Sequence, residues 1–312
     1  MNSYSATDRK MQFAELIFCS VVYPTKSSEI NSLLLAESLR TFTSASSELP
    51  IWFFFPDYGN QLTQKTHDRL VDLDVTLIPF KISREQLQFF FASEVRAVAL
   101  AEALCAGNCD YLAWMDTNTV VLQEPEGFFL PENTSLGYRP VHHLLLGSRF
   151  DQELDPFWTR IYRSCDVPPE HVFSMNPVVE DLRMRPYFNA GILVTRPELG
   201  LFQSWRDTFL RYYQEPGFQQ FYKQDDRYVI FMHQAILSGV ILNKFQKENL
   251  LELPWTYNYP LHLFYQNETD YRPSSLEDLI TFRHEGFYQD PDWRAKMPAD
   301  EPLKDWLADR VI

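Results

Sequence analysis

The sequence predicts an α/β fold in which helices cover both faces of a mostly parallel β-sheet. Between residues 16 and 115, apolar runs of strand length alternate with helical patterns, which is typical of parallel strands joined by crossover helices. These runs are continuously apolar instead of alternating, which indicates a sheet buried on both faces. With 312 residues, of which 15% are aromatic, the chain is long enough to bury a sizeable core.

The first half of the chain supplies four strand candidates: residues 16–23, 51–55, 75–80 and 111–115. Helical patterns separate them. The first opens at 27–29 with serine as the expected N-cap, the second lies near 62–70, and the third is alanine-rich and runs from 94 to 106. The regular alternation predicts that the four strands lie in one parallel sheet.

The second half is less regular. Residues 187–195 are expected to form a turn that leads into a buried strand, and 201–214 and 229–240 are expected to be helices. Residues 251–293 are rich in proline and aromatics, which indicates irregular structure lying over a site. No repeat and no convincing linker is present, so we expect one compact domain.

Charge and composition exclude several classes of partner. A formal net charge of −14 argues against nucleic acid or an anionic membrane as the main partner. A phosphate-bearing ligand stays compatible, because a metal ion or a local cationic pocket can hold it. The sequence shows no run of about 18 apolar residues and no signal-peptide core, so we expect no membrane span and a cytoplasmic location. The spacing of the four cysteines favours packed, reduced thiols over a metal site.

The stretch "YLAWMDTNTVVLQEP" (111–125) places Asp116 and Asn118 between two apolar runs. In open α/β sheets, ligands bind outside the carboxyl ends of the strands. Asp116 lies at such an end and is therefore expected to face a ligand. The alternative is local, because Asp-Thr-Asn is also good turn chemistry for the end of a strand.

Five segments occur in one order between residues 14 and 293: "WMDTNTVVLQEP", "YFNAGILVTRPE", "HQAIL", "LPWTYNY" and "ITFRHEGFYQDPDW". This ordered set resembles the family 8-like glycosyltransferases of GT-A fold, which include glycogenin-like and galactosyltransferase-like enzymes. The resemblance implies a Rossmann-like sheet with a mixed α+β C-terminal half. It implies a single domain over 1–312, with a nucleotide-binding half at 14–125, an acceptor and donor-sugar half at 126–293 and a C-terminal tail at 294–312.

The activity implied by the resemblance is transfer of a sugar from a nucleotide-diphosphate sugar, expected to be a UDP-sugar, to an acceptor hydroxyl. Retention of anomeric configuration is implied in the same way. The acceptor is unknown, and assembly into a homo-oligomer is left open.

By the same resemblance, Mn²⁺ or Mg²⁺ would be held by Asp116, Asn118 and His284 and would stabilise charge on the leaving diphosphate. Asn118 is the main departure, because the family usually has a second acid there. An amide in place of a carboxylate removes one unit of negative charge and should weaken the binding of the metal ion. Three interpretations follow: a weakened metal site, a metal-independent enzyme or an inactive scaffold.

Further donor contacts are implied at Cys19, Ser20, Val21, Asp57, Thr117 and Gly191. Arg96, on the helix before residues 111–115, would lie near the diphosphate or ribose, since guanidinium suits phosphate oxygens. A solvated surface arginine is the alternative. The resemblance also places the closing tryptophan at Trp293, but the lysine that often precedes its Pro-Trp pair is absent.

Asn189 and Gln234 are expected to contact the donor sugar or the acceptor. The local alternative for Asn189-Ala190-Gly191 is a tight turn. His233 stands where the family often has an aspartate, and a satisfied helix histidine is its alternative role.

If the reaction inverts configuration, it needs a general base. The candidates are Asp225, Asp226, Glu180 and Asp181, with no basis for choosing among them.

Two other functions are compatible with parts of the sequence. A catalytically inactive GT-A domain that binds a nucleotide or a partner fits Asn118 and His233. A nucleotidyltransferase would need a glycine-rich phosphate loop after the first strand, and residues 24–28, Pro-Thr-Lys-Ser-Ser, contain no glycine. That class therefore ranks last.

Overall fold

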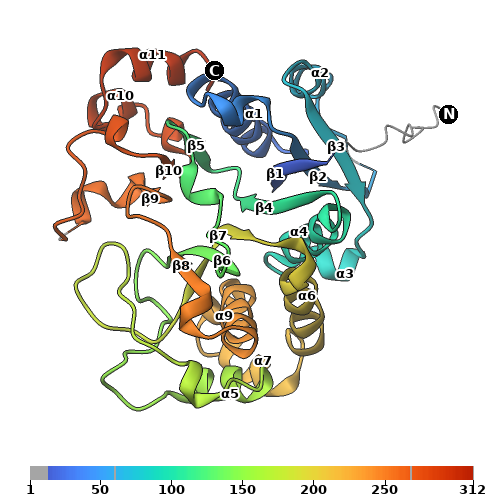
Figure 1. Ribbon diagram of the computed structural model, residues 1–312, viewed down its shortest axis with the longest axis vertical. Helices are drawn as coiled ribbons and strands as arrows, with labels where there is room; N and C mark the ends of the chain where they lie inside the picture. Colours follow the sequence, from blue (N-terminus) through green and yellow to red (C-terminus); the bar gives the residue numbers. More distant parts are fainter. Residues whose placement is uncertain (1–12, 60, 268, 312) are drawn as a thin grey trace.

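The computed structural model describes residues 13–59, 61–267 and 269–311, and its centre is a seven-stranded sheet of order β3-β2-β1-β4-β7-β6-β8 (Figure 1). Its strands are β1 (Ala14–Val21), β2 (Ile51–Pro56), β3 (Val75–Phe80), β4 (Cys109–Met115), β6 (Leu136–Pro140), β7 (Phe188–Thr195) and β8 (Leu250–Glu252). Strands β1 to β4 are parallel, β7 is antiparallel to both neighbours, and β8 is parallel to β6. The predicted mostly parallel α/β fold is confirmed.

The helices are α1 (Lys26–Phe42), α2 (Gln64–Asp72), α3 (Arg84–Leu87), α4 (Ala92–Cys105), α5 (Pro156–Ser164), α6 (Leu201–Tyr212), α7 (Pro216–Tyr222), α8 (Asp226–Ile230), α9 (Met232–Lys244), α10 (Trp293–Lys296) and α11 (Glu301–Ala308). Thr25, and not a serine, caps α1, because its hydroxyl accepts the Ser28 N–H at 3.4 Å. The helix predicted at 229–240 is interrupted at Phe231, between α8 and α9.

The two faces of the sheet pack on different helices because successive strand residues point to opposite faces. Leu16 and Phe18 of β1 belong to the core shared with α1 and α2. Ile17 and Cys19 belong to the core shared with α4, α6 and α9. Burial on both faces explains why these strands carry no polar alternation.

A second, three-stranded sheet of order β5-β10-β9 lies beside the first (Figure 1). It comprises β5 (Thr119–Val121), β9 (Tyr259–Pro260) and β10 (Thr281–Arg283). Thr119 is paired with Arg283 in an antiparallel register. The region expected to be irregular therefore contains strands, and one of them brings a distant segment next to Asp116.

Residues 294–311, expected to form a tail, contain α11, which packs on α1 (Figure 1). The rings of Phe42 and Trp306 lie 4.9 Å apart. The four cysteines are buried and unpaired. Within the described residues, no helix combines the length and apolar character needed to cross a bilayer.

Candidate active site

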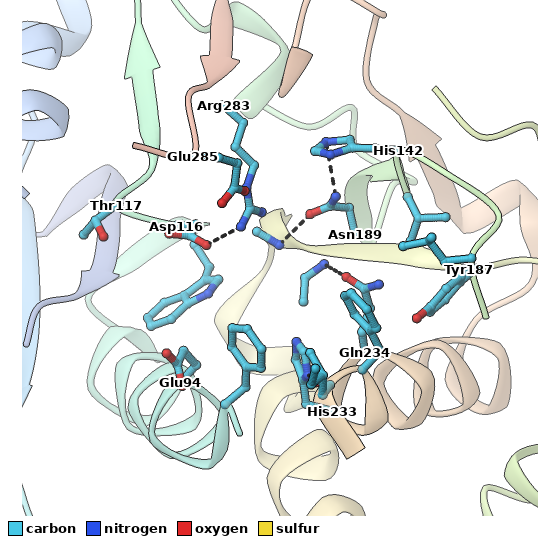
Figure 2. Close-up of a pocket in the computed structure, with 18 of the residues that line it drawn as sticks. Glu94, Asp116, Thr117, His142, Tyr187, Asn189, His233, Gln234, Arg283 and Glu285 are labelled. Carbon is cyan, nitrogen blue, oxygen red and sulfur yellow. Dashed lines mark hydrogen bonds and ion pairs between the residues drawn. The ribbon is translucent and has the colours of Figure 1, made fainter. Parts of the chain in front are cut away.

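A cavity of about 400 Å³ opens where β1 and β4 end and β7 begins (Figure 2). Because β7 runs antiparallel to β4, its first residues lie at the same sheet edge as the end of β4. The backbone N–H of Asp116 accordingly donates to the carbonyl of Gly191 at 2.8 Å. The topology thus joins the "DTN" and "NAG" segments at one wall.

Asp116 is held on both of its carboxylate oxygens. Oδ1 accepts the backbone N–H of Asn118 at 3.0 Å, which is the local turn bond, and Oδ2 accepts from Nη2 of Arg283 at 2.7 Å. The turn interpretation and the cavity-facing interpretation of Asp116 therefore hold together. Sequence reasoning did not identify Arg283.

Arg283 sits between two carboxylates, because its Nε also donates to Glu285 (Figure 2). Its side chain is only 15% exposed. Burial alone would lower the pKa of Arg283, but Asp116 and Glu285 raise it above the ordinary value. The guanidinium is thus a fixed positive charge in the cavity wall.

The other two predicted metal ligands do not line the cavity. Asn118 Oδ1 accepts from Asn31 Nδ2 at 2.7 Å, and its own Nδ2 lies 3.5 Å from Glu285. His284 is buried: its Nδ1 accepts from the Gly286 N–H at 3.0 Å, and its Nε2 has no partner among the residues described. Burial lowers the pKa of His284 to about 3, so the ring is neutral.

This arrangement does not fit a divalent cation. Mn²⁺ and Mg²⁺ favour several oxygen ligands, usually with carboxylate charge. Here Asp116 is already paired with a guanidinium, and the Asn118 oxygen accepts a hydrogen bond from Asn31. Of the three predicted ligands, only His284 has an atom without a hydrogen-bond partner among the described residues, its Nε2. Over the described ranges, no group of three or more His, Cys, Asp or Glu could hold a metal. Metal dependence stays a prediction from the resemblance.

Asn189 and Gln234 both line the cavity, and both bond backbone N–H groups near the start of strand β7. Asn189 Oδ1 accepts the Gly191 N–H at 2.8 Å, and Gln234 Oε1 accepts the Ala190 N–H at 3.0 Å (Figure 2). A Cβ at Gly191 would lie 2.2 Å from Nη1 of Arg283, so any larger residue here would displace the guanidinium. The Asn-x-Gly pattern lies within strand β7 and not in the predicted tight turn, and its glycine leaves room for the guanidinium.

One wall of the cavity is aromatic. Phe91 stacks on His233 with ring centroids 4.1 Å apart and planes 24° apart, and Trp205 donates from Nε1 to the His233 carbonyl at 2.8 Å. His233 Nδ1 bonds to the Ile230 carbonyl at 3.0 Å, and burial lowers the pKa of His233 to about 3. This is the satisfied-histidine role. Phe91 has a left-handed φ of 59°. This backbone conformation is unfavourable for a bulky residue, and residues that adopt it are concentrated at functional sites in proteins.

Glu94 lines the cavity, and Arg96 does not. Residues two apart on a helix point to different sides, so α4 turns Arg96 toward Arg206 of α6. Burial raises the pKa of Glu94 to about 7, beside Tyr23. The sequence signal that could have found Glu94 is an acidic residue in the first turn of the helix that precedes β4.

The remaining predicted contacts divide by position. Val21 and Thr117 line the cavity, whereas Cys19 and Ser20 are buried in β1. Two of the predicted residues lie away from the cavity: Asp57, exposed after β2, and Asp225, which caps α8 and pairs with Arg227. The rule of carboxyl ends locates the correct edge, but the direction of each side chain decides which residues face a ligand.

Comparison with known proteins agrees with this geometry. The sequence model of the family described as the Rhodobacterales glycosyltransferase domain matches residues 19–241. No curated protein is significantly similar in sequence.

Among solved structures, the galactosyltransferase LgtC in complex with donor and acceptor sugar analogues has a TM-score of 0.50 at 12% identity, with 96% of this chain and 95% of that chain covered. An active-site mutant of LgtC gives 0.51 at 10% identity, with 93% and 99% covered. The bifunctional glycosyltransferase WbbM gives 0.47 at 13% identity. It covers 96% of this chain, which spans about half (52%) of WbbM.

At this low identity, the likeness to the LgtC structures extends to the fold alone. The family match covers the sheet edge, Asp116, Asn189 and Gln234. The chain belongs to the Rhodobacterales glycosyltransferase family and has the GT-A fold of nucleotide-sugar transferases.

Proposed function

We propose that the protein transfers a sugar from a nucleotide-diphosphate sugar, with a UDP-sugar as the expected donor, to an acceptor hydroxyl. The observation that carries the proposal is the convergence of Asp116, Asn189 and Gln234 on one cavity with the guanidinium of Arg283. The family membership supports it.

The groups in the cavity suit the charges of such a reaction. When the donor breaks, negative charge grows on the leaving diphosphate, and a preorganised cation stabilises it. The amides of Asn189 and Gln234 can hydrogen-bond sugar hydroxyls, and the aromatic wall around Phe91 can pack against a flat ring and exclude water.

Retention of configuration, which rests on the family resemblance, needs no protein base, because the leaving phosphate can accept the acceptor proton. If the enzyme inverts instead, none of the four candidate bases lines the cavity, and Glu180 is connected to it only through His143. Glu180 Oε1 lies 3.7 Å from Nδ1 of His143, which lines the cavity, whereas Asp225 is paired elsewhere with Arg227.

A catalytically inactive domain that binds a nucleotide or a partner is the second candidate. Two observations favour it: the neutral amide at Asn118, and the pairing of Asp116 with Arg283 in place of a metal-ready carboxylate.

Calorimetric titration with UDP and a hydrolysis assay over a panel of UDP-sugars test both candidates. We expect UDP to bind and one UDP-sugar to be hydrolysed, with hydrolysis lost in Gln234→Ala and kept in Gln220→Ala, a control on the exposed face of α7. Binding without turnover of any donor would favour the inactive domain. A chain that binds no UDP would contradict both nucleotide-dependent functions.

A further inference from the structure

We infer that the guanidinium of Arg283 takes the place of the divalent cation, binding the donor diphosphate so that this enzyme needs no metal. The inference rests on the proposed function and deepens it, because it names the group that receives the diphosphate.

The first argument is charge. Among the described residues that line the cavity, Arg283 is the one arginine or lysine. Burial lowers the pKa of three lining histidines, His142, His233 and His262, so these rings are neutral near pH 7. In a chain of net charge −14, a diphosphate needs a local cation, and Arg283 is the permanent cation among the described lining residues.

The second argument is position. Arg283 Nη2 lies 2.7 Å from Oδ2 of Asp116, the carboxylate that the resemblance gives to the metal. A guanidinium carries five N–H donors, and the contacts with Asp116 and Glu285 use one on Nη2 and the one on Nε. Nη1 makes no hydrogen bond to any part of the chain that the structure describes, and it lies over Gly191. Its N–H groups are available for phosphate oxygens, which arginine binds in bidentate geometry.

The third argument is the support around the guanidinium. The pairing of β10 with β5 places Arg283 opposite Thr119, and the missing Cβ of Gly191 leaves the space that Nη1 occupies. On the other side, Asn31 donates to Asn118 and accepts from the Tyr288 hydroxyl at 3.0 Å. The contact with Asn31 occupies the Asn118 amide oxygen, which is the atom that a metal would need.

The amide at Asn118 is consistent with a diphosphate site built on Arg283. Asp116, Glu285 and Arg283 together carry a net charge of −1. A second acid at position 118 would make it −2, which suits a divalent cation but opposes a diphosphate held by one guanidinium. The substitution that should weaken a metal site is therefore the one that a guanidinium site favours.

In the transfer step, the bond between the anomeric carbon and the β-phosphate oxygen breaks, and its electron pair leaves with the diphosphate. The acceptor oxygen forms the new bond to that carbon, and the acceptor proton ends on a diphosphate oxygen. Arg283 exchanges no proton, because a guanidinium stays charged in proteins. It touches the leaving group and stabilises its charge.

The test is calorimetric titration of the full chain with UDP, in EDTA and again with Mn²⁺ or Mg²⁺. We expect the same affinity in all three buffers within about twofold. Arg283→Met should weaken UDP binding by at least about tenfold, the range of a charge-assisted hydrogen bond, and Arg283→Lys by less. Arg160→Met is the matched control: Arg160 also pairs with a carboxylate, Glu215, and packs over a glycine, Gly217, away from the cavity.

Two results overturn the inference while leaving the proposed function standing: UDP binding that appears only with metal, or Arg283→Met binding UDP like the wild type. No UDP binding in any buffer would contradict the proposed function itself.

Thermal melting of each variant identifies loss of folding. If Arg283→Met does not fold, Gly191→Ala replaces it, because it displaces the guanidinium without removing its charge. Unchanged UDP affinity in folded Gly191→Ala would also overturn the inference.

Discussion

The first four strands and the short strand β10 contribute to the protein in different ways. Strands β1 to β4 are mostly apolar runs that form most of the sheet, and β1, β2 and β4 are largely buried. Strand β10 has three residues, Thr281–Arg283, and it brings the charged groups Arg283 and Glu285 to Asp116 across 167 positions of sequence. The scaffold is thus encoded locally, whereas the charge of the site is assembled from distant segments.

If the scaffold and the site are separate in this way, substitutions in the scaffold should lower stability and leave the affinity of the folded protein for UDP unchanged. Phe53 of β2 is 1% exposed, so Phe53→Ala should lower the free energy of unfolding by about 3–5 kcal/mol through the cavity it leaves. Urea denaturation measures this, and Val71→Ala on the exposed face of α2 should change it by less than about 0.5 kcal/mol. A folded Phe53→Ala protein with strongly weakened UDP binding would break the comparison.

Substitutions at the site around Arg283 should instead weaken UDP binding and change stability little. Gly191→Ala pushes a Cβ against the Arg283 guanidinium and should weaken UDP binding by about tenfold with a small change in melting temperature. Gly217→Ala is the matched control, because it pushes a Cβ against the guanidinium of Arg160 instead. We expect a similar change in melting temperature there and normal UDP affinity. Equal UDP affinities for the two variants would contradict the division.

A carboxylate at position 118 tests whether the site can be converted to bind a metal ion. Asn118→Asp should introduce a second acid beside Asp116 and allow Mn²⁺ to compete with Arg283. The variant should show a melting temperature that rises by a few degrees with Mn²⁺, as binding to the folded state requires, while the wild type shows none. The same rise in both proteins would mean that the wild type already binds the ion.

The smallest expected effect is a pH dependence at Glu94. Its pKa in the folded protein is raised to about 7, against an ordinary value of 4.5. The folded state therefore holds a proton that the unfolded state releases. The stabilisation is complete below about pH 4.5 and is lost as the pH rises toward 7.

Urea denaturation from pH 5 to 8 should show this loss in the wild type and not in Glu94→Gln, whose amide cannot ionise. The difference in slope should stay below the roughly 1.4 kcal/mol per pH unit of one full proton. His233 and His284, with pKa values lowered to about 3, act oppositely, since their stabilisation is lost as the pH falls from 6.5 toward 3. Both histidines are present in the wild type and in Glu94→Gln, so their contributions cancel in the difference between the two slopes. Identical slopes would show that Glu94 ionises normally.

Much of the scaffold was predictable, because the apolar runs at 16–23 and 75–80 correspond to β1 and β3 with shifts of at most two residues. Asp116 was predictable because it follows directly on β4. Arg283 was not, since its role depends on pairing between the three-residue strands β5 and β10, and strands this short leave no periodicity to read. Its neighbour His284 drew attention by resemblance, but alternation along the chain turns that ring into the interior.

Arg96 and Asn118 show a second limit. The sequence predicts both at the correct edge of the sheet, but neither side chain lines the cavity. The direction of Arg96 follows from the rotation of α4, and that of Asn118 follows from the hydrogen bond with Asn31 of α1. These directions depend on tertiary contacts, so composition and spacing alone do not determine them.

The separation of 167 positions between Asp116 and Arg283 has a consequence during synthesis. At the ~5–20 residues per second of a ribosome, Arg283 emerges about 8–33 seconds after Asp116. The helices and strands of the nucleotide half can form in that interval, but the nascent chain lacks the counter-charge of Asp116. A ribosome-bound intermediate that ends before β10 should therefore bind nucleotide diphosphates weakly, and substrate would be captured only after β10 has been made.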